Sequence, residues 1–219
     1  MTDTLRFVDA ASLTDLRTFL ERAAAVEEGS VRVIAGGPVV AVYVAVLYPV
    51  GLSDPTPTVL GLRTFAQDGA GEADVVVPVR SLLERVARLS ADGTLELRLP
   101  HPVGSVTWAG IAPPRRGWTE HEGLDPAPLR AAAEAGIAEV ARAVPAASGS
   151  PLVRKVRSEV WSRELPAPPH LPAGAAFAAV ALGFLGEDRP RVLTTGPWTR
   201  LSSQRGHVLV HRRPWSLRG

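Results

Sequence analysis

The sequence contains no cysteine, and this absence excludes several kinds of site. Without thiols the chain forms no disulfide and no thiolate metal site, and it has no cysteine nucleophile. Lysine is nearly absent as well, because Lys155 is the single lysine among the 24 basic residues. No lysine follows a glycine-rich segment, so a Walker phosphate-binding loop is excluded.

Long hydrophobic runs are also lacking, although 46% of the 219 residues are hydrophobic, which is enough for a substantial core. The longest apolar run extends from Val39 to Tyr48, whereas a helix needs about 20 residues to cross a bilayer. Residues 1–6 have neither the basic nor the apolar segment of a secretory signal. We therefore expect a cytoplasmic protein that has no contact with a membrane.

Charge is divided unevenly along the chain. Residues 1–149 hold 13 basic and 18 acidic side chains, whereas residues 150–219 hold 11 basic and 4 acidic ones. Aromatic and imidazole side chains are interleaved with the C-terminal arginines: Trp161, Trp198, Trp215, His170, His207 and His211. This asymmetry indicates an anionic partner, which we expect to be an acidic protein or a nucleic acid.

The first half of the chain predicts helices packed on an antiparallel sheet. Apolar residues at helical spacing predict helices over residues 12–28, capped by Ser12, and 79–89. Alternating or β-branched segments predict strands over residues 31–35, 39–48, 58–65, 75–77, 94–99 and 105–108. We expect the first two strands to form a hairpin through Gly36-Gly37-Pro38, and the last two strands to pair with each other.

One stretch resembles a known family. Residues 75–83, followed by Asp92-Gly93-Thr94-Leu95, are similar to a segment of the sliding clamps, whose repeating half-domains are also built of helices backed by antiparallel sheet. The resemblance is confined to this stretch, so we assign no family from it.

The segment from Ile111 to Gly123 is rich in Pro, Arg and Gly and predicts a linker. It would separate an α+β unit over residues 1–112 from a helix-rich basic unit over residues 118–219, and one continuous domain is the alternative. In the second unit we expect helices over residues 126–143, from residue 150 and over 173–185, followed by a terminal β-hairpin of strands 191–195 and 206–211. The predicted fold class is therefore α+β.

Three helices followed by two strands is also the order of a winged helix, a DNA-binding module. A recognition helix presents polar side chains to the bases, but residues 173–185 are almost all small or apolar. This composition argues against a winged helix and favours a buried helix.

No catalytic or cofactor motif is found, so we expect no cofactor and leave catalysis undecided. The nucleophile elbow and the His-Glu-x-x-His metal motif are both missing. His207 and His211 would share one face of a strand, and Glu120-His121-Glu122 places an imidazole between two carboxylates. A metal needs three or four converging ligands, so we interpret these histidines as surface residues.

The leading hypothesis is a non-catalytic interaction or scaffolding protein whose basic C-terminal half contacts an acidic protein or a nucleic acid. The anion-binding residues would be Arg154, Lys155, Arg157, Arg200 and Arg205. If they act together, they should converge on one surface. The sequence does not give the oligomeric state.

The alternative is a pocket for a small anionic ligand, with or without chemistry, in the segment 196–207. Trp198 would form a wall beside His207, and Arg200 and Arg205 would donate hydrogen bonds to the anion. The structural interpretation of the same segment is a hairpin whose tryptophan covers the core. Trp118, in the linker, would either bind a partner through cation–π contact or fix the linker to the body.

Overall fold

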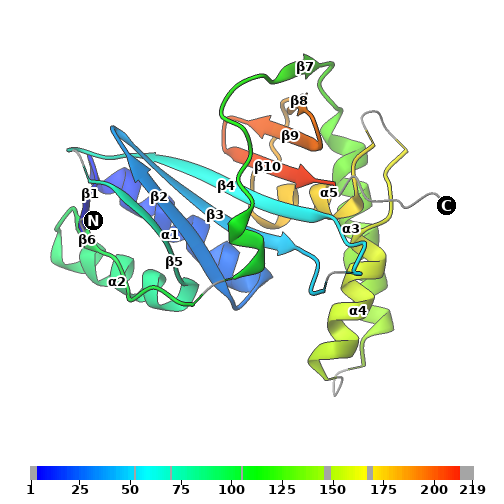
Figure 1. The fold of residues 1–219 in the computed structure, drawn as a ribbon, viewed down its shortest axis with the longest axis horizontal. Coiled ribbons are helices and arrows are strands. Elements are labelled where there is room, and N and C mark those ends of the chain that lie inside the picture. The colour runs from blue at the N-terminus through cyan, green and yellow to red at the C-terminus, as the bar shows by residue number, and fades with distance from the viewer. Residues whose placement is uncertain are drawn as a thin grey trace. The chain divides into compact units, whose positions relative to one another are not determined.

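The computed structural model describes residues 4–51, 53–69, 71–104, 106–145, 149–166 and 170–212. The chain divides into two compact units, residues 1–45 with 62–111 (unit 1) and residues 46–61 with 112–219 (unit 2). Strands β3 (Val39–Leu47) and β4 (Thr58–Ala66) contribute residues to both units. Each unit combines helices with antiparallel sheet, so the fold class is α+β, as predicted (Figure 1). Trp215 lies outside the described residues.

Unit 1 contains the strand order β5-β2-β3-β4, with β2 at Ser30–Gly36 and β5 at Ala73–Pro78. The β2–β3 hairpin is confirmed, because Gly36 pairs with Val39 across Gly37, whose φ is +58°. Helices α1 (Ala10–Val26) and α2 (Val79–Asp92) pack against each other. Their buried side chains lie at helical spacing, for example Leu16 with Leu20 and Leu82 with Val86.

The N-terminus of α1 differs from the prediction. Asp9 is the N-cap, and its carboxylate accepts a hydrogen bond from the backbone N–H of Ser12 at 2.7 Å. The helix therefore begins two residues before Ser12, because Asp is as good a cap as Ser and lies at the residue where the backbone is extended.

The predicted pairing of strands 94–99 and 105–108 is wrong. The strand β6 (Glu96–Arg98) pairs with β1 (Thr4–Arg6), and Leu97 lies opposite Leu5 with both side chains buried. Residues Thr107–Gly110 form a 3-10 helix, η1, in which Trp108 is buried. The alternation of residues 94–99 therefore predicts a strand correctly, but the partner of this strand lies at the other end of the unit's sequence.

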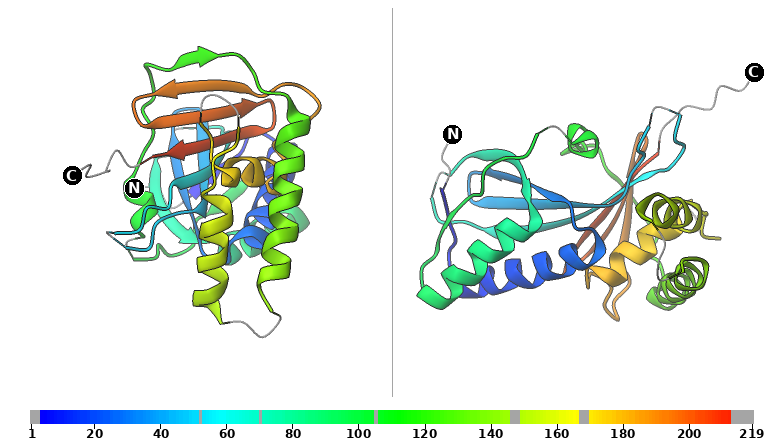
Figure 2. Two further views of the ribbon diagram at one scale, coloured as in Figure 1. Left: turned by 90° about the vertical axis from the view of Figure 1, so that its right-hand side faces the viewer. Right: turned by 90° about the horizontal axis from the view of Figure 1, so that it is seen from below.

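Unit 2 contains the strand order β4-β10-β9-β8-β7. Its strands after β4 are β7 (Thr119–His121), β8 (Arg191–Thr195), β9 (Trp198–Ser203) and β10 (Gly206–His211). Helices α3 (Pro126–Ala143), α4 (Ser150–Trp161) and α5 (Ala173–Ala181) lie on one side of this sheet (Figure 2). The start of α3 is confirmed, since the Asp125 carboxylate accepts from Ala127 N at 2.9 Å and Pro126 is the first helical residue.

The buried helix predicted over residues 173–185 is confirmed but is shorter, ending at Ala181. Its small side chains pack beneath β10, and Phe184 lies so close to Gly206 that a Cβ there would be 2.6 Å from the ring atom Cδ1. Among the described residues, no helix has both the length and the apolar character needed to span a membrane.

One predicted strand pairing in unit 2 is wrong. Residues 191–195 and 206–211 do not pair with each other, because the intervening residues form β9, which pairs with both. Three strands therefore follow the three helices, which is not the order of a winged helix. The segment from Ile111 to Gly123, predicted as a linker, contains β7, which pairs with β8 at the edge of the sheet.

Candidate anion-binding site

The two faces of β9 carry different side chains. Leu201 pairs with Val208, and Gly206, on the same face, meets Phe184 beside α5, so this face is directed toward the helices. Because successive side chains alternate, Arg200 and Ser202 lie on the other face. The strand register places Arg200 between Leu193 and Leu209, both of which are buried.

Arg200 is stacked on a tryptophan from the predicted linker. Its Cζ atom lies 4.6 Å from the centroid of the Trp118 ring, within the range of a cation–π contact. The indole Nε1 of Trp118 donates to the carbonyl oxygen of Pro114 at 2.8 Å, which holds the ring over the sheet. Trp118 therefore fixes the linker to unit 2, one of the two roles predicted for it.

The electrostatics around Arg200 are unfavourable for a cation. Burial lowers the pKa of Arg200, and the positive charge of Arg191 lowers it further. Burial also lowers the pKa of His207, with smaller contributions from Arg200 and Arg191. The imidazole Nδ1 of His207 lies 2.9 Å from the hydroxyl of Ser202, on the same face as Arg200. Three basic side chains thus meet on this face of the sheet.

Other arginines of unit 2 are neutralised by carboxylates that precede residue 150. Glu120 accepts two hydrogen bonds from Arg191, at 2.7 and 2.8 Å, and Glu139 accepts two from Arg163. Arg189 pairs with Glu122. These three pairs balance part of the charge asymmetry in space, which the separate counts for the two segments did not reveal.

The predicted cations of α4 are differently placed. Arg154 and Lys155 are exposed, and the Lys155 ammonium lies 3.9 Å from the Glu159 carboxylate. Arg157 is half-buried, with its Cζ 6.0 Å from the centroid of the Phe177 ring. Arg205 lies exposed in the turn between β9 and β10, and Figures 1 and 2 show this turn well apart from α4. The five cations therefore fall into two groups, one on α4 and one on the hairpin.

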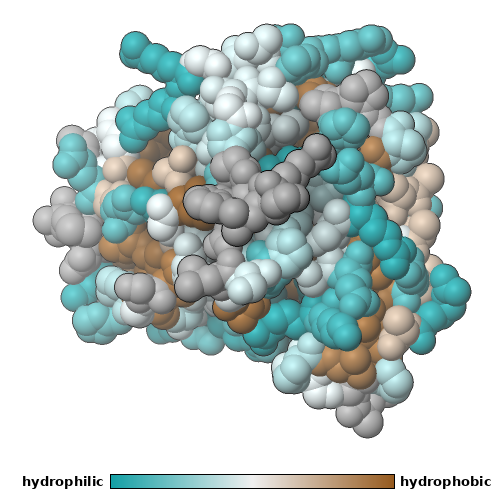
Figure 3. Space-filling model, turned by 45° about the vertical axis from the view of Figure 1, so that its right-hand side comes forward, coloured by the Kyte–Doolittle hydropathy of each residue, from teal (hydrophilic) through white to brown (hydrophobic). Residues whose placement is uncertain are grey.

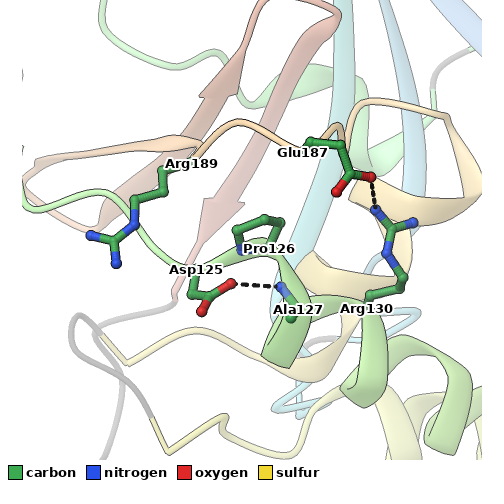
Figure 4. A pocket seen from close by; sticks show the side chains of 6 residues that line it. All are labelled: Asp125, Pro126, Ala127, Arg130, Glu187 and Arg189. Carbon is green, nitrogen blue, oxygen red and sulfur yellow. Dashed lines mark hydrogen bonds and ion pairs between the residues drawn. The ribbon is translucent and has the colours of Figure 1, made fainter.

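Trp198 is a core side chain, with 4% of its surface exposed and its ring 4.7 Å from that of His211. A hollow of about 310 Å³ lies elsewhere, at the N-terminus of α3 (Figure 4). Its cations are paired, since Arg130 lies 3.7 Å from Glu187 and Arg189 contacts Glu122. Within the described part of the chain, no three His, Asp or Glu side chains are placed to hold a metal ion.

The surface of α3 and α4 is not uniformly hydrophilic. Ile137 on α3 and Leu152 on α4 are large apolar side chains, and they are 44% and 46% exposed. Figure 3 shows hydrophobic surface between hydrophilic side chains over the lobe that these helices form. The position next to Ile137, Gly136, is buried instead and packs against Trp161.

Residues 1–110 match the family model described as "Domain of unknown function (DUF8010)", and residues 113–215 match the one described as "Domain of unknown function (DUF8185)". Among curated proteins, none matches the chain. Among solved structures, the chain is similar to the DNA polymerase sliding clamp from Caulobacter crescentus, with a TM-score of 0.51 and 14% identity over 98% of this chain and 66% of that chain. A structure described as Caulobacter crescentus pol III beta gives a TM-score of 0.52 and 14% identity over 97% and 66% of the two chains.

This chain therefore spans just under two thirds of the length of those clamps. At such low identity the likeness shows the fold alone, and it extends over nearly the whole chain, far beyond the stretch from Val75 to Leu95 whose sequence resembles a clamp segment.

Proposed function

The chain belongs to the DUF8010 family of domains of unknown function, and we propose that it is a non-catalytic scaffolding protein that contacts nucleic acid through α4. The observation that carries the proposal is the exposed pair Arg154 and Lys155 on a helix of a clamp-like fold. We place the action of the protein in the cytoplasm.

The charge on α4 supports a polyanionic partner. Residues 150–161 carry three basic side chains and one acidic side chain, Glu159. Because Glu159 lies at 3.9 Å from Lys155 and both groups are exposed, this pair neutralises little of the charge. Arg154 has no partner among the described residues.

Nucleic acid fits this surface better than an acidic protein does. Binding to the phosphate backbone requires only a cationic surface, without the polar recognition side chains that α5 lacks. The solved structures with the same fold are described as DNA polymerase sliding clamps, which supports the same partner class. An acidic protein surface is the alternative that the experiment separates.

The test compares two double variants of equal charge change. R154E/K155E reverses the two exposed cations of α4, and the matched control R115E/R116E reverses two exposed arginines before β7. Association with a fluorescein-labelled DNA duplex is measured by anisotropy at about 50 mM salt, where phosphate contacts are strong. We expect R154E/K155E to lose about tenfold or more in affinity, because two phosphate contacts become repulsive.

The control should lose much less affinity, and both variants should keep the wild-type thermal midpoint. An equal loss in the two variants would show a general effect of net charge and refute the role of α4. If the wild type does not bind DNA or RNA under these conditions, nucleic acid is excluded and an acidic protein is left as the partner.

A further inference from the structure

Arg200 differs from the other arginines of its sheet in having no counter-ion. Its guanidinium makes no hydrogen bond and no ion pair within the described part of the chain, and its Nε atom is buried without a hydrogen-bond partner. Arg191, one strand away, is fully neutralised by Glu120. A buried N–H of a charged group that lacks a partner costs folding free energy, so such a group is usually paired.

The surroundings hold Arg200 in place for a ligand. The guanidinium Cζ lies over the Trp118 ring, and Leu193 and Leu209 flank the strand position of Arg200. The N–H groups of a guanidinium lie in the plane of that group and are directed outward along its edge. Because Nε is buried, a ligand would reach the Nη1–Nη2 edge of the group, and the Trp118 contact restricts the motion of that edge.

The net charge of the basic side chains Arg191, Arg200 and His207, together with Glu120, indicates which kind of ligand fits. Arg191 and Glu120 cancel, and His207 is neutral at pH 7 because its pKa is lowered by burial and by the two arginines. One uncompensated positive charge therefore remains, on Arg200. A carboxylate carries one negative charge and has two coplanar oxygens, which match the guanidinium edge. A nucleic acid backbone would instead require several unpaired cations in a row.

We propose that Arg200, stacked on Trp118, is a binding site for a single carboxylate group. The carboxylate would accept hydrogen bonds from the guanidinium edge, beside the Ser202–His207 pair. Its source is either a small carboxylic acid or an Asp or Glu side chain of a partner. This site lies on β9 and is independent of the contact proposed for α4.

The experiment follows the Nε–Hε signal of Arg200 by ¹H–¹⁵N NMR, assigned through its loss in R200K. Sodium acetate, succinate, an acetylated Glu-rich peptide, inorganic phosphate and chloride are titrated at a constant ionic strength of about 0.1 M. We expect the signal to move and saturate with the carboxylates but not with chloride. Saturation by acetate or succinate at lower concentration than by the peptide identifies a small ligand, and the reverse order identifies a peptide.

Two variants test the assignment. R200K keeps the positive charge but not the planar edge of the guanidinium. We expect its affinity for a carboxylate to fall about tenfold, because one charge-assisted hydrogen bond is lost. The Trp118 indole signal is used to measure this affinity. The matched variant R205K, in the exposed turn of the same hairpin, should bind as the wild type does. If R200K fails to fold, W118F serves instead, and its carboxylate affinity should fall because the stack is weakened.

Three results would overturn the proposal. They are an Arg200 signal that no carboxylate moves, a shift that chloride reproduces at the same ionic strength, and saturation by phosphate at lower concentration than by any carboxylate. None of them would affect the α4 experiment, which uses different residues and a different ligand.

Discussion

Replacing Gly136 by Ala should destabilise unit 2, although Ala is the better helix former. Gly136 lies in the middle of α3, where Gly costs about 1 kcal/mol relative to Ala. A Cβ atom built there would lie 2.6 Å from Cη2 of Trp161 and closer still to Cζ3. These atoms belong to a rigid ring rather than to the end of a flexible side chain.

The Trp161 ring has little freedom to move away. It is 2% exposed, and it is stacked on Phe177 with the ring centroids 4.3 Å apart and the planes 15° from parallel. Overpacking of this kind costs about 1–3 kcal/mol. After the gain in helix propensity, we expect G136A to lose up to about 2 kcal/mol, or up to about 8 °C in thermal midpoint.

Circular dichroism during thermal unfolding measures this difference. The control A135G changes the neighbouring exposed position and reports the helix propensity without a ring contact. In a W161F background the atoms Cζ3 and Cη2 are gone, so G136A should raise the midpoint relative to W161F alone. A G136A protein more stable than the wild type would refute the close packing of α3 on Trp161.

Two further predictions concern His207 and the segment before β7. Because burial lowers the pKa of His207 in the folded state, the unfolded chain binds a proton at this residue first as the pH falls from about 7 to 5, and the free energy of unfolding should decrease. The urea midpoint should therefore fall less in H207Q than in the wild type over this pH range. An equal fall in the two proteins would contradict the burial of this imidazole. Limited trypsin digestion should cut first after Arg115 or Arg116, which are exposed, and peptide mapping that finds earlier cuts elsewhere would contradict this.

The elements of this fold that carry local signals could be predicted from the sequence. Asp125 and Pro126 mark the start of α3, and Gly93, with φ of +69°, marks the end of α2. The exposed positions on α3 could not be predicted, because helical spacing alone favours burying Ile137 over Gly136. Gly136 is buried instead because the Trp161 ring of α4 packs against it and occupies the space that a side chain at this position would fill.

Strand pairing was harder to predict because its determinants are distant. The strand β1 has three residues, too few for a periodic pattern, and it lies at the opposite end of the sequence of unit 1 from its partner β6. The strand β9 was missed because four of its six residues are polar, and only Trp198 and Leu201 carry an apolar signal.

The candidate site was only partly predictable for the same reason. Arg200 could be selected from its dense polar surroundings, but Trp118, its stacking partner, lies in the segment interpreted as a linker. The excess of arginine after residue 149 was visible, whereas its neutralisation by Glu120, Glu122 and Glu139 depends on contacts between distant segments.

The salt dependence of DNA binding tests the central claim, that α4 contacts nucleic acid, most directly. Each phosphate contact on duplex DNA contributes about −0.9 to the slope of log K against log salt concentration. Engagement of all three α4 cations, Arg154, Lys155 and Arg157, predicts a slope of about −2.7 for the wild type and about −0.9 or less in magnitude for R154E/K155E. A wild-type protein that does not bind, or a slope that the α4 substitutions leave unchanged, would contradict the account.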